Sequence, residues 1–321
     1  MRILYAPIFE EGTVHETAVR CKRGLFTAFA KAGHQVTEFD YLAHRATFEQ
    51  DMLDLMRLCQ PEMVLGQYHG ADVMTPGFQK ELKGSYPNTI FCVWSGDSWL
   101  HSLTAQPMID LLRHVDLQLV AAPDVLPEYE RLGIRAAYWN IAVEPSIGEL
   151  PDMPAYDVVF LGNVINDKRR AMLEMLRTLP YKVGIYGDWE HADGRNVYNF
   201  AAGEALYKKA RLAIADNVYQ DQQRYISNRP MQIMAAGGAL CLHQYVERLE
   251  EMTGWVSGAH YIEWRNLEEL HDLIQDLLFS PLENNPFYRA MINGARAHVL
   301  EHHTFDARVR QLFEMLEGIP V

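Results

Sequence analysis

The segment 227–238 reads Ser-Asn-Arg-Pro-Met-Gln-Ile-Met-Ala-Ala-Gly-Gly, a run of residue types that can bind a diphosphate at the start of a helix. Its serine or Asn228 can cap the helix, the proline suits the first turn, and Gly237 ends it before an apolar strand. A helix start attracts anions through unpaired N–H groups, and Arg229 adds a full charge beside them. Gln232 lies on the same face and can bond a ribose hydroxyl. The alternative is a capped, buried helix whose arginine pairs with a nearby carboxylate.

A second candidate phosphate site follows a predicted strand at Gly162-Asn163. A glycine allows close approach of the backbone to a phosphate, and the basic run Lys168-Arg169-Arg170 follows within a few residues to neutralise it. The alternative is a plain strand-to-helix turn with a solvated basic helix face. We expect Gly162, Asn163, Lys168 and Arg169 to contact a bound phosphate group.

The run Tyr186-Gly187-Asp188-Trp189 ends another predicted strand. Its aromatic ring can stack on a nucleobase, and its carboxylate can make a polar contact, so we count Tyr186, Gly187 and Asp188 among the nucleotide-binding candidates. A tight turn beside a half-buried tryptophan is the alternative.

In the first half of the chain, four residues follow predicted strands: Gly12 and His15 after the first, His69 after the third and Asp97 after the fourth. Carboxylates and imidazoles in such places can act as general bases that take the proton of a hydroxyl, and Asp97, His69 and His15 are the candidate catalytic groups. The alternatives are a capping or turn role for Asp97 and structural or exposed roles for the histidines.

These residues need strands and helices to position them, and the chain alternates the two. In the first half, strands are predicted at 2–6, 35–40, 63–66, 89–94, 117–121 and 136–139, with helices at 16–32, 47–59, 76–83, 107–114 and 123–132. The proline-containing segment 144–154 is predicted to be a linker. In the second half, strands are predicted at 156–161, 182–186, 212–215, 239–242 and 260–263, with helices at 167–179, 203–210, 228–236, 246–252, 267–279, 286–302 and 305–316.

This alternation predicts an α/β fold of two Rossmann-like units with parallel sheets, in which ligands bind beyond the carboxyl ends of the strands. Neither unit has Gly-x-Gly-x-x-Gly after its first strand, which argues against a dinucleotide cofactor. A length of 321 residues suits two domains.

The composition narrows the partners. The net charge of −13 opposes long-range attraction to DNA or an anionic membrane. The apolar runs are too short to span a bilayer and the start lacks a signal-peptide core, so we expect a cytoplasmic protein with no membrane partner. Four scattered cysteines and the lack of a suitable Asp-x-Asp predict no metal site.

Several fragments resemble one enzyme family in the order in which they occur. They are 157–163 with 168–170, 186–189, 206–214, the helix segment 227–240 and 303–308. Together they are similar to GT-B glycosyltransferases, closest to the spore-maturation-protein-like (group 1 type) family, which includes phage members. That family usually has glutamate, which holds the ribose, where this chain has Gln232; the amide lacks the charge, so donor affinity or nucleotide choice can differ.

The resemblance implies a GT-B fold, in which two Rossmann-like domains face each other across a cleft. We expect an N-terminal acceptor domain at 1–145, a donor domain at 155–300, and a C-terminal helix at 301–321 that packs back on the N-terminal domain. The implied enzyme is a metal-independent hexosyl- or pentosyltransferase that uses a nucleotide diphosphate sugar, with UDP-sugar favoured, and no cofactor. GT-B enzymes often place a glycine loop near the diphosphate of this donor, so the resemblance adds Gly12 to the donor-binding candidates above. A transfer with inversion needs a base near the acceptor hydroxyl, which Asp97, His69 or His15 would supply. A nucleotide-sugar epimerase of the same fold and a non-catalytic nucleotide-sugar-binding relative are the alternatives. The acceptor, which can be a protein, a glycan, a small molecule or modified DNA, and the oligomeric state stay open.

Overall fold

The computed structural model describes residues 1–7, 16–41, 44–68, 71–95, 105–144, 155–194, 200–217, 224–279 and 285–317. The chain divides into two compact units. Unit 1 comprises Met1–Ile141 and Phe305–Val321, and unit 2 comprises Ala142–Thr304. The chain therefore passes between the units twice.

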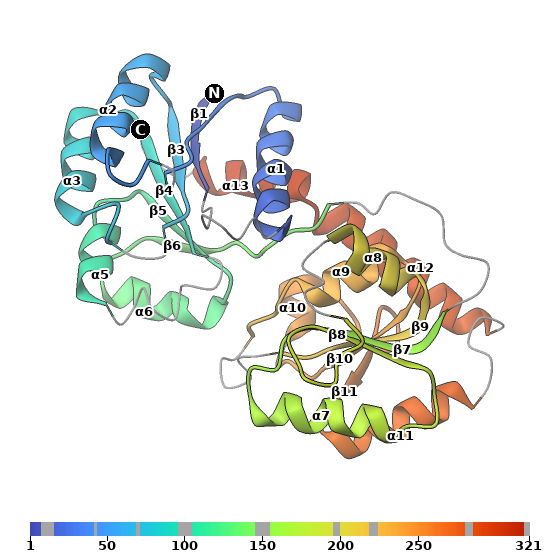
Figure 1. Cartoon of the computed structure of the whole chain (residues 1–321). Helices are drawn as coiled ribbons and strands as arrows, with labels where there is room; N and C mark the ends of the chain where they lie inside the picture. Colours follow the sequence, from blue (N-terminus) through green and yellow to red (C-terminus); the bar gives the residue numbers. More distant parts are fainter. Residues whose placement is uncertain are drawn as a thin grey trace. The chain divides into compact units, whose positions relative to one another are not determined.

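Unit 1 is built on a six-stranded parallel sheet of order β2-β1-β3-β4-β5-β6 (Figure 1). Its strands are β1 (Arg2–Ala6), β2 (Gln35–Glu38), β3 (Met63–Gly66), β4 (Ile90–Ser95), β5 (Leu117–Val120) and β6 (Ala136–Tyr138). Its helices are α1 (Glu16–Lys31), α2 (Phe48–Cys59), α3 (Pro76–Ser85), α5 (Gln106–Leu112), α6 (Leu126–Arg131), preceded by the short 3₁₀ helix η1 (Pro123–Val125), and α13 (Phe305–Leu316). Helices α2, α3 and α5 cover one face of the sheet, and α1 and α13 cover the other.

The last helix, α13, is part of the core of unit 1. The ring of Phe313 meets that of Phe29 on α1 edge-on, with centroids 6.3 Å apart. Gly24 leaves the space that the ring of Phe305 fills, since a side chain there would overlap that ring. An ion pair between Lys31 and Asp306, 3.6 Å apart, lies at the edge of the same contact.

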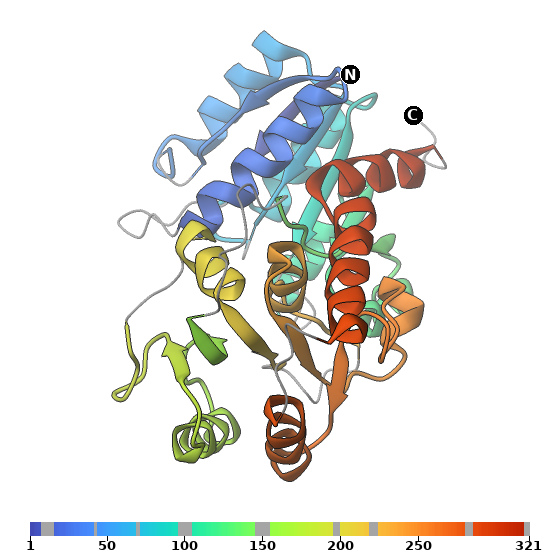
Figure 2. The same cartoon turned by 90° about the vertical axis from the view of Figure 1, so that its right-hand side faces the viewer.

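Unit 2 contains a five-stranded parallel sheet of order β11-β10-β9-β7-β8. Its strands are β7 (Tyr156–Leu161), β8 (Val183–Tyr186), β9 (Ala210–Ala215), β10 (Leu240–Gln244) and β11 (Ile262–Trp264). Its helices are α7 (Asp167–Thr178), α8 (Phe200–Lys208), α9 (Arg229–Ala236), α10 (Leu249–Thr253), α11 (Leu267–Leu278) and α12 (Pro286–His302). Helices α8, α9 and α12 lie side by side on one face, and α7 and α11 lie on the other (Figures 1 and 2).

Helices cover both faces of this sheet. Successive side chains of a strand point to opposite faces, so all of them can be buried. Leu240 and Leu242 of β10 join the core under α7 and α11, while Cys241 between them joins the core under α8, α9 and α12. Burial raises the pKa of the Cys241 thiol, which behaves as a small core hydrophobe. Strands covered on both sides read as continuous apolar runs, and this made them recognisable in the sequence.

The α/β prediction of two parallel-sheet units is confirmed, and most element bounds differ from the prediction by one to three residues. Two differences have clear causes. Strand β10 continues through two buried polar residues, His243 and Gln244, which the apolar pattern did not include. Helix α10 begins at Leu249 rather than at 246, because Arg248 adopts a left-handed conformation with φ of 56°.

Candidate functional site

The carboxyl edge of the unit 2 sheet brings together residues from three distant segments. Strands β7 and β9 are neighbours, so the residues that follow them, Gly162 and Asp216, meet at the same edge. Helix α9 begins at this edge with Arg229, and helix α7 supplies Arg169. Open parallel sheets bind ligands at this edge. In the described part of unit 2, the side chains of Arg169, Asp216 and Arg229 lie there, beside the backbone of Gly162.

Asp216 lies between the two arginines. Its Oδ2 accepts from Nε of Arg169 at 2.7 Å, and its Oδ1 accepts from Nη2 of Arg169 at 3.0 Å and from Nη1 of Arg229 at 2.5 Å. The side chains of Arg169, Asp216 and Arg229 are 2%, 7% and 13% exposed, so water screens their charges little. Two guanidinium groups share one carboxylate, so these three side chains together keep a net positive charge. We call them the arginine–aspartate group.

Arg229 is also bonded to the backbone of both neighbouring strands. Its Nε donates to the carbonyl oxygen of Leu161 at 2.7 Å, and its Nη1 donates to that of Asp216 at 3.1 Å. The guanidinium carbon lies 4.9 Å from the centroid of the Phe160 ring, a cation–π contact. Arg229 thus extends from the start of α9 across the ends of β7 and β9. The carboxylate partner foreseen as the alternative is present, and it is Asp216.

Arg169 supports the site from inside. Its three guanidinium nitrogens bond to Asp216 and to the carbonyl oxygen of Asn163, the last at 2.7 Å from Nη1, and the residue is 3% exposed. The phosphate contact that the sequence predicts for Arg169 would therefore need a guanidinium nitrogen that is already bonded within the protein. Its neighbour Lys168 is exposed overall. Partial burial lowers the pKa of its ammonium group, and the smaller effect of the negative charge of Asp216 raises it.

The turn after β7 packs tightly against the turn after β8. Asn163 accepts from the N–H of Asp188 through its Oδ1 at 2.8 Å, and the N–H of Gly162 donates to the carbonyl of Tyr186 at 2.8 Å. Gly187 has φ of +149°, and a side chain on it would overlap the carbonyl oxygen of Gly162. Gly187 therefore allows the close approach of one backbone turn to the other.

Tyr186 is bonded within the fold. Its hydroxyl lies 2.6 Å from that of Tyr156, and the two rings meet edge-on. Burial, with the hydrogen bond shared with Tyr156, raises the pKa of Tyr186. Both rings pack against the core under α8, whereas the side chain of Asp188 is exposed.

The predicted helix 228–236 is found as α9, Arg229–Ala236. Asn228 occupies the N-cap position without a side-chain capping bond, and Gln232 is half-buried one turn into the helix. Gly237 ends the helix with φ of 72° and packs against the side chain of Arg296. Gly237 thus lies at the opposite end of α9 from Arg229, where its conformation terminates the helix, and the structure does not bring it to the arginine–aspartate group.

The candidates in unit 1, Gly12, His15, His69 and Asp97, lie outside the described residues. The described end of β4 is Ser95, a fully buried residue whose Oγ accepts from Nε2 of Gln118 at 2.8 Å.

Asp216 was not among the residues singled out from the sequence. The signal was nevertheless available: Ile214-Ala215-Asp216 places a carboxylate directly after a predicted strand, the position where chemistry was sought. The missing information was its partners, which lie 47 and 13 residues away in the chain.

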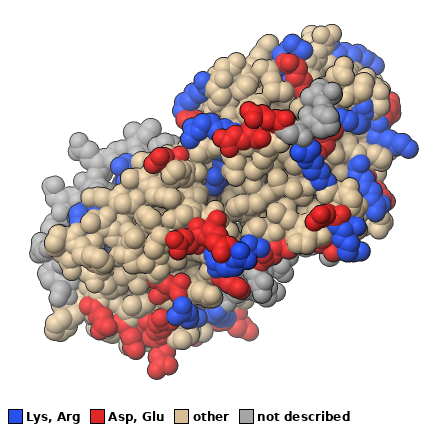
Figure 3. Space-filling model, turned by 180° about the vertical axis from the view of Figure 1, so that it is seen from behind, with Lys and Arg blue, Asp and Glu red and all other residues tan. Residues whose placement is uncertain are grey.

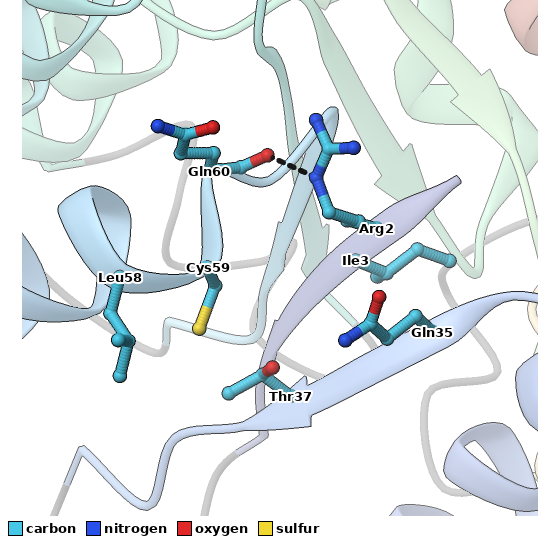
Figure 4. A pocket seen from close by; sticks show the side chains of 7 residues that line it. All are labelled: Arg2, Ile3, Gln35, Thr37, Leu58, Cys59 and Gln60. Atoms are coloured by element: carbon cyan, nitrogen blue, oxygen red, sulfur yellow. Dashed lines mark hydrogen bonds between the residues drawn. The ribbon is translucent and has the colours of Figure 1, made fainter.

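A separate pocket lies in unit 1 at the amino ends of β1 and β2, beside the end of α2 (Figure 4). Arg2 points toward the end of α2, where its Nε donates to the carbonyl oxygen of Gln60 at 2.8 Å. The other lining residues are Ile3, Gln35, Thr37, Leu58 and Cys59. This pocket lies at the edge of the sheet opposite to the one where parallel sheets bind ligands.

Charged side chains of both signs occur together on the surface. On the face in Figure 3, basic side chains of the described residues stand beside acidic ones rather than forming one continuous basic field. Within the described ranges, no group of three or more His, Cys, Asp or Glu side chains is placed to hold a metal ion. No described helix combines the length and the apolar character needed to cross a membrane.

Comparison with known proteins gives one family match, to the glycosyl transferase-like family over residues 168–314. This segment contains Arg169, Asp216 and Arg229, the whole arginine–aspartate group. No curated protein matches the sequence.

Solved structures match over the whole chain. HepE from Anabaena in complex with UDP and glucose is 10% identical, with 99% of this chain and 100% of that chain covered and a TM-score of 0.64. A glycosyltransferase from Rickettsia africae is 10% identical, with 98% and 97% covered and a TM-score of 0.60. The phage T4 β-glucosyltransferase is 13% identical, with 100% of both chains covered and a TM-score of 0.60. These likenesses show the GT-B fold, and the family match identifies the enzyme class as glycosyltransferase.

Proposed function

We propose that this glycosyltransferase moves a sugar from a nucleotide diphosphate sugar, with a UDP-sugar as the favoured donor, to an acceptor hydroxyl. Unit 2 holds the donor in this proposal. The observation that carries it is the net positive group of Arg229, Asp216 and Arg169 at the carboxyl edge of the unit 2 sheet, where α9 begins. UDP occupies HepE, a protein of the same fold, which favours UDP among the nucleotides.

The chemistry follows from this charge. The bond between the anomeric carbon and the β-phosphate oxygen breaks, the acceptor oxygen bonds to that carbon, and the diphosphate leaves with additional negative charge. Arg229 and the exposed Lys168 stabilise that charge by Coulomb attraction and hydrogen bonds, without a divalent cation. In an inverting reaction the acceptor proton passes to a base, and Asp97 and His69 are the proposed bases.

The resemblance of the ordered fragments supports a further assignment to the spore-maturation-like group.

Isothermal titration with UDP, GDP and TDP tests the donor part of the proposal. We expect UDP to bind most tightly; a folded protein that binds none of the three contradicts the proposal. Mass spectrometry after incubation with UDP-glucose and candidate acceptors then tests the reaction. A transferase yields UDP and a glycosylated acceptor in the presence of EDTA, whereas an epimerase returns an altered nucleotide sugar without any acceptor.

A further inference from the structure

The hydrogen bonds of the two arginines leave one guanidinium nitrogen without a partner among the described residues. Arg169 uses all three of its nitrogens inside the protein. Arg229 uses Nε and Nη1 on Leu161 and Asp216, and its Nη2 makes no hydrogen bond to the part of the chain that the structure describes. Nη2 carries two N–H donors, so this atom is the one through which the pair can bind an anion.

Gly162 determines where this nitrogen lies. A Cβ atom built on Gly162 would be 2.5 Å from Nη2 and 3.3 Å from the guanidinium carbon of Arg229, far closer than a carbon and a nitrogen can pack. Arg229 therefore lies directly over the backbone of the turn after β7. Among the twenty residues, only glycine leaves this space.

Asp216 fixes the other side of the same guanidinium. Its Oδ1 holds Nη1 of Arg229, and its Oδ2 is held by Arg169, which is itself bonded to Asn163. The carboxylate cannot rotate toward solvent without breaking bonds to both arginines. Nη2 of Arg229 is therefore presented in one orientation, at no further cost in side-chain ordering when an anion binds.

We infer that Asp216 and Gly162 are positioning residues that present Nη2 of Arg229 to an anionic oxygen of the bound nucleotide diphosphate. The inference rests on the proposed function and adds two residues to it, one of which, Asp216, contacts the donor only through Arg229. Gly162 acts by the room it leaves beside Nη2, in place of the direct phosphate contact expected from the sequence.

The first test is Gly162→Ala. The atom displaced by the new methyl group is the tip of a side chain, so the variant folds while Nη2 moves away from its position. We expect the Kd for UDP to rise about tenfold or more, the usual effect of losing a hydrogen bond between charged groups. The Kd for uridine, measured by NMR titration, stays unchanged because uridine has no phosphate. Gly294→Ala is the matched control, since a methyl group there meets nothing closer than 3.8 Å.

The second test is Asp216→Asn. This change removes the charge that holds both arginines, and we again expect a rise of about tenfold in the Kd for UDP with the Kd for uridine unchanged. The matched control is Asp157→Asn. Asp157 pairs with Arg211 at 3.1 Å across the same two strands, β7 and β9, but at their amino ends. The control should leave both dissociation constants unchanged.

The outcomes separate the inference from the function beneath it. Wild-type protein that binds neither UDP, GDP nor TDP removes the proposed function. Wild-type protein that binds UDP, together with a Gly162→Ala variant of equal UDP affinity, overturns the positioning role and leaves the function standing. A variant that binds both UDP and uridine more weakly, by the same factor, also overturns the positioning role, because a general distortion of the site would weaken both ligands equally.

Discussion

The indole Nε1 of Trp139 donates a hydrogen bond to the backbone carbonyl oxygen of Arg308 at 2.9 Å, and both residues are buried. Arg308 in turn donates from Nε to the carbonyl oxygen of Asn140 at 2.8 Å. These two bonds join α13 to the residues that follow β6, although 169 positions separate Trp139 from Arg308 in the sequence. Unit 1 therefore depends on the far end of the chain for part of its core.

Replacing Arg308 by Met tests this dependence. The methionine fills a similar space but leaves the carbonyl of Asn140 without its donor, and we expect the free energy of unfolding to fall by about 1–3 kcal/mol. Urea denaturation measures the loss. The Kd for UDP should not change, since Arg308 belongs to unit 1, and a loss of UDP affinity without a loss of stability would contradict this assignment.

Arg229→Ala and Arg229→Lys test the proposed donor site directly. Alanine removes every donor of the guanidinium, and we expect UDP binding to weaken about a hundredfold, while lysine keeps the charge but loses the fork and weakens it about tenfold. Asp216 keeps Arg169 as its partner in both variants, so the fold is retained. Titration calorimetry gives the affinities, with circular dichroism as the check on folding. Equal UDP affinity of the alanine variant and wild type would reduce Arg229 to a structural role.

Gln232→Glu tests the departure from the resembling family. The side chain at this position is half-buried, one turn into α9. A carboxylate accepts hydrogen bonds from two ribose hydroxyls more strongly than an amide does, and we expect the Kd for UDP to fall about fivefold. The Kd for 2′,3′-dideoxyuridine diphosphate should not fall with it. A gain that is equal for both ligands would locate the effect away from the ribose.

Gly187→Ala tests the packing of the two turns. The residue has φ of +149°, and its new methyl group would overlap the carbonyl oxygen of Gly162, so we expect a loss of stability of about 2 kcal/mol or more. Gly77→Ala on α3 is the control, because open space surrounds that position and alanine favours the helix. Urea denaturation should show a large loss for the first variant and none for the second.

The pH dependence of stability should report His243. This histidine is fully buried beside the rings of Trp255 and Tyr261, and burial lowers its pKa to about 4. Between pH 6.5 and 4 the unfolded chain binds a proton at this site and the folded chain does not. The free energy of unfolding therefore falls as the pH drops through this window, by about 2 kcal/mol at pH 5 from this residue.

His243→Phe keeps the ring contacts and removes the titration. Urea denaturation at pH 7.5, 6 and 5 should show that the variant loses less stability than wild type on acidification. Identical losses would mean that the pKa of His243 is not lowered in the folded protein.

The sequence was sufficient for the elements of the fold because strands buried on both faces are continuous apolar runs of four to six residues. The start of β7 and both ends of α12 were predicted to the residue. The strand end at His243 and Gln244 was missed, since its two polar residues are buried by contacts that no local pattern shows.

The site was less accessible to sequence reasoning. Arg229 could be singled out because it begins a helix, a local feature. That Arg169 is buried, and that Asp216 is its partner, depends on the pairing of β7 with β9, which only the folded chain reveals. Gly237 was grouped with the site by its nearness in sequence, although a helix of eight residues separates it from the edge where Arg229 lies.

The passage of the chain through the two units has a consequence for biosynthesis. Unit 2 is a continuous stretch, Ala142–Thr304, whereas unit 1 takes α13 from residues that leave the ribosome after all of unit 2. Unit 2 can thus reach its native structure during translation, before the last helix of unit 1 has been synthesised. A nascent chain halted after Thr304 would carry a complete unit 2 and an unfinished unit 1, with the surface of α1 that Phe305 and Phe313 cover left open to chaperones.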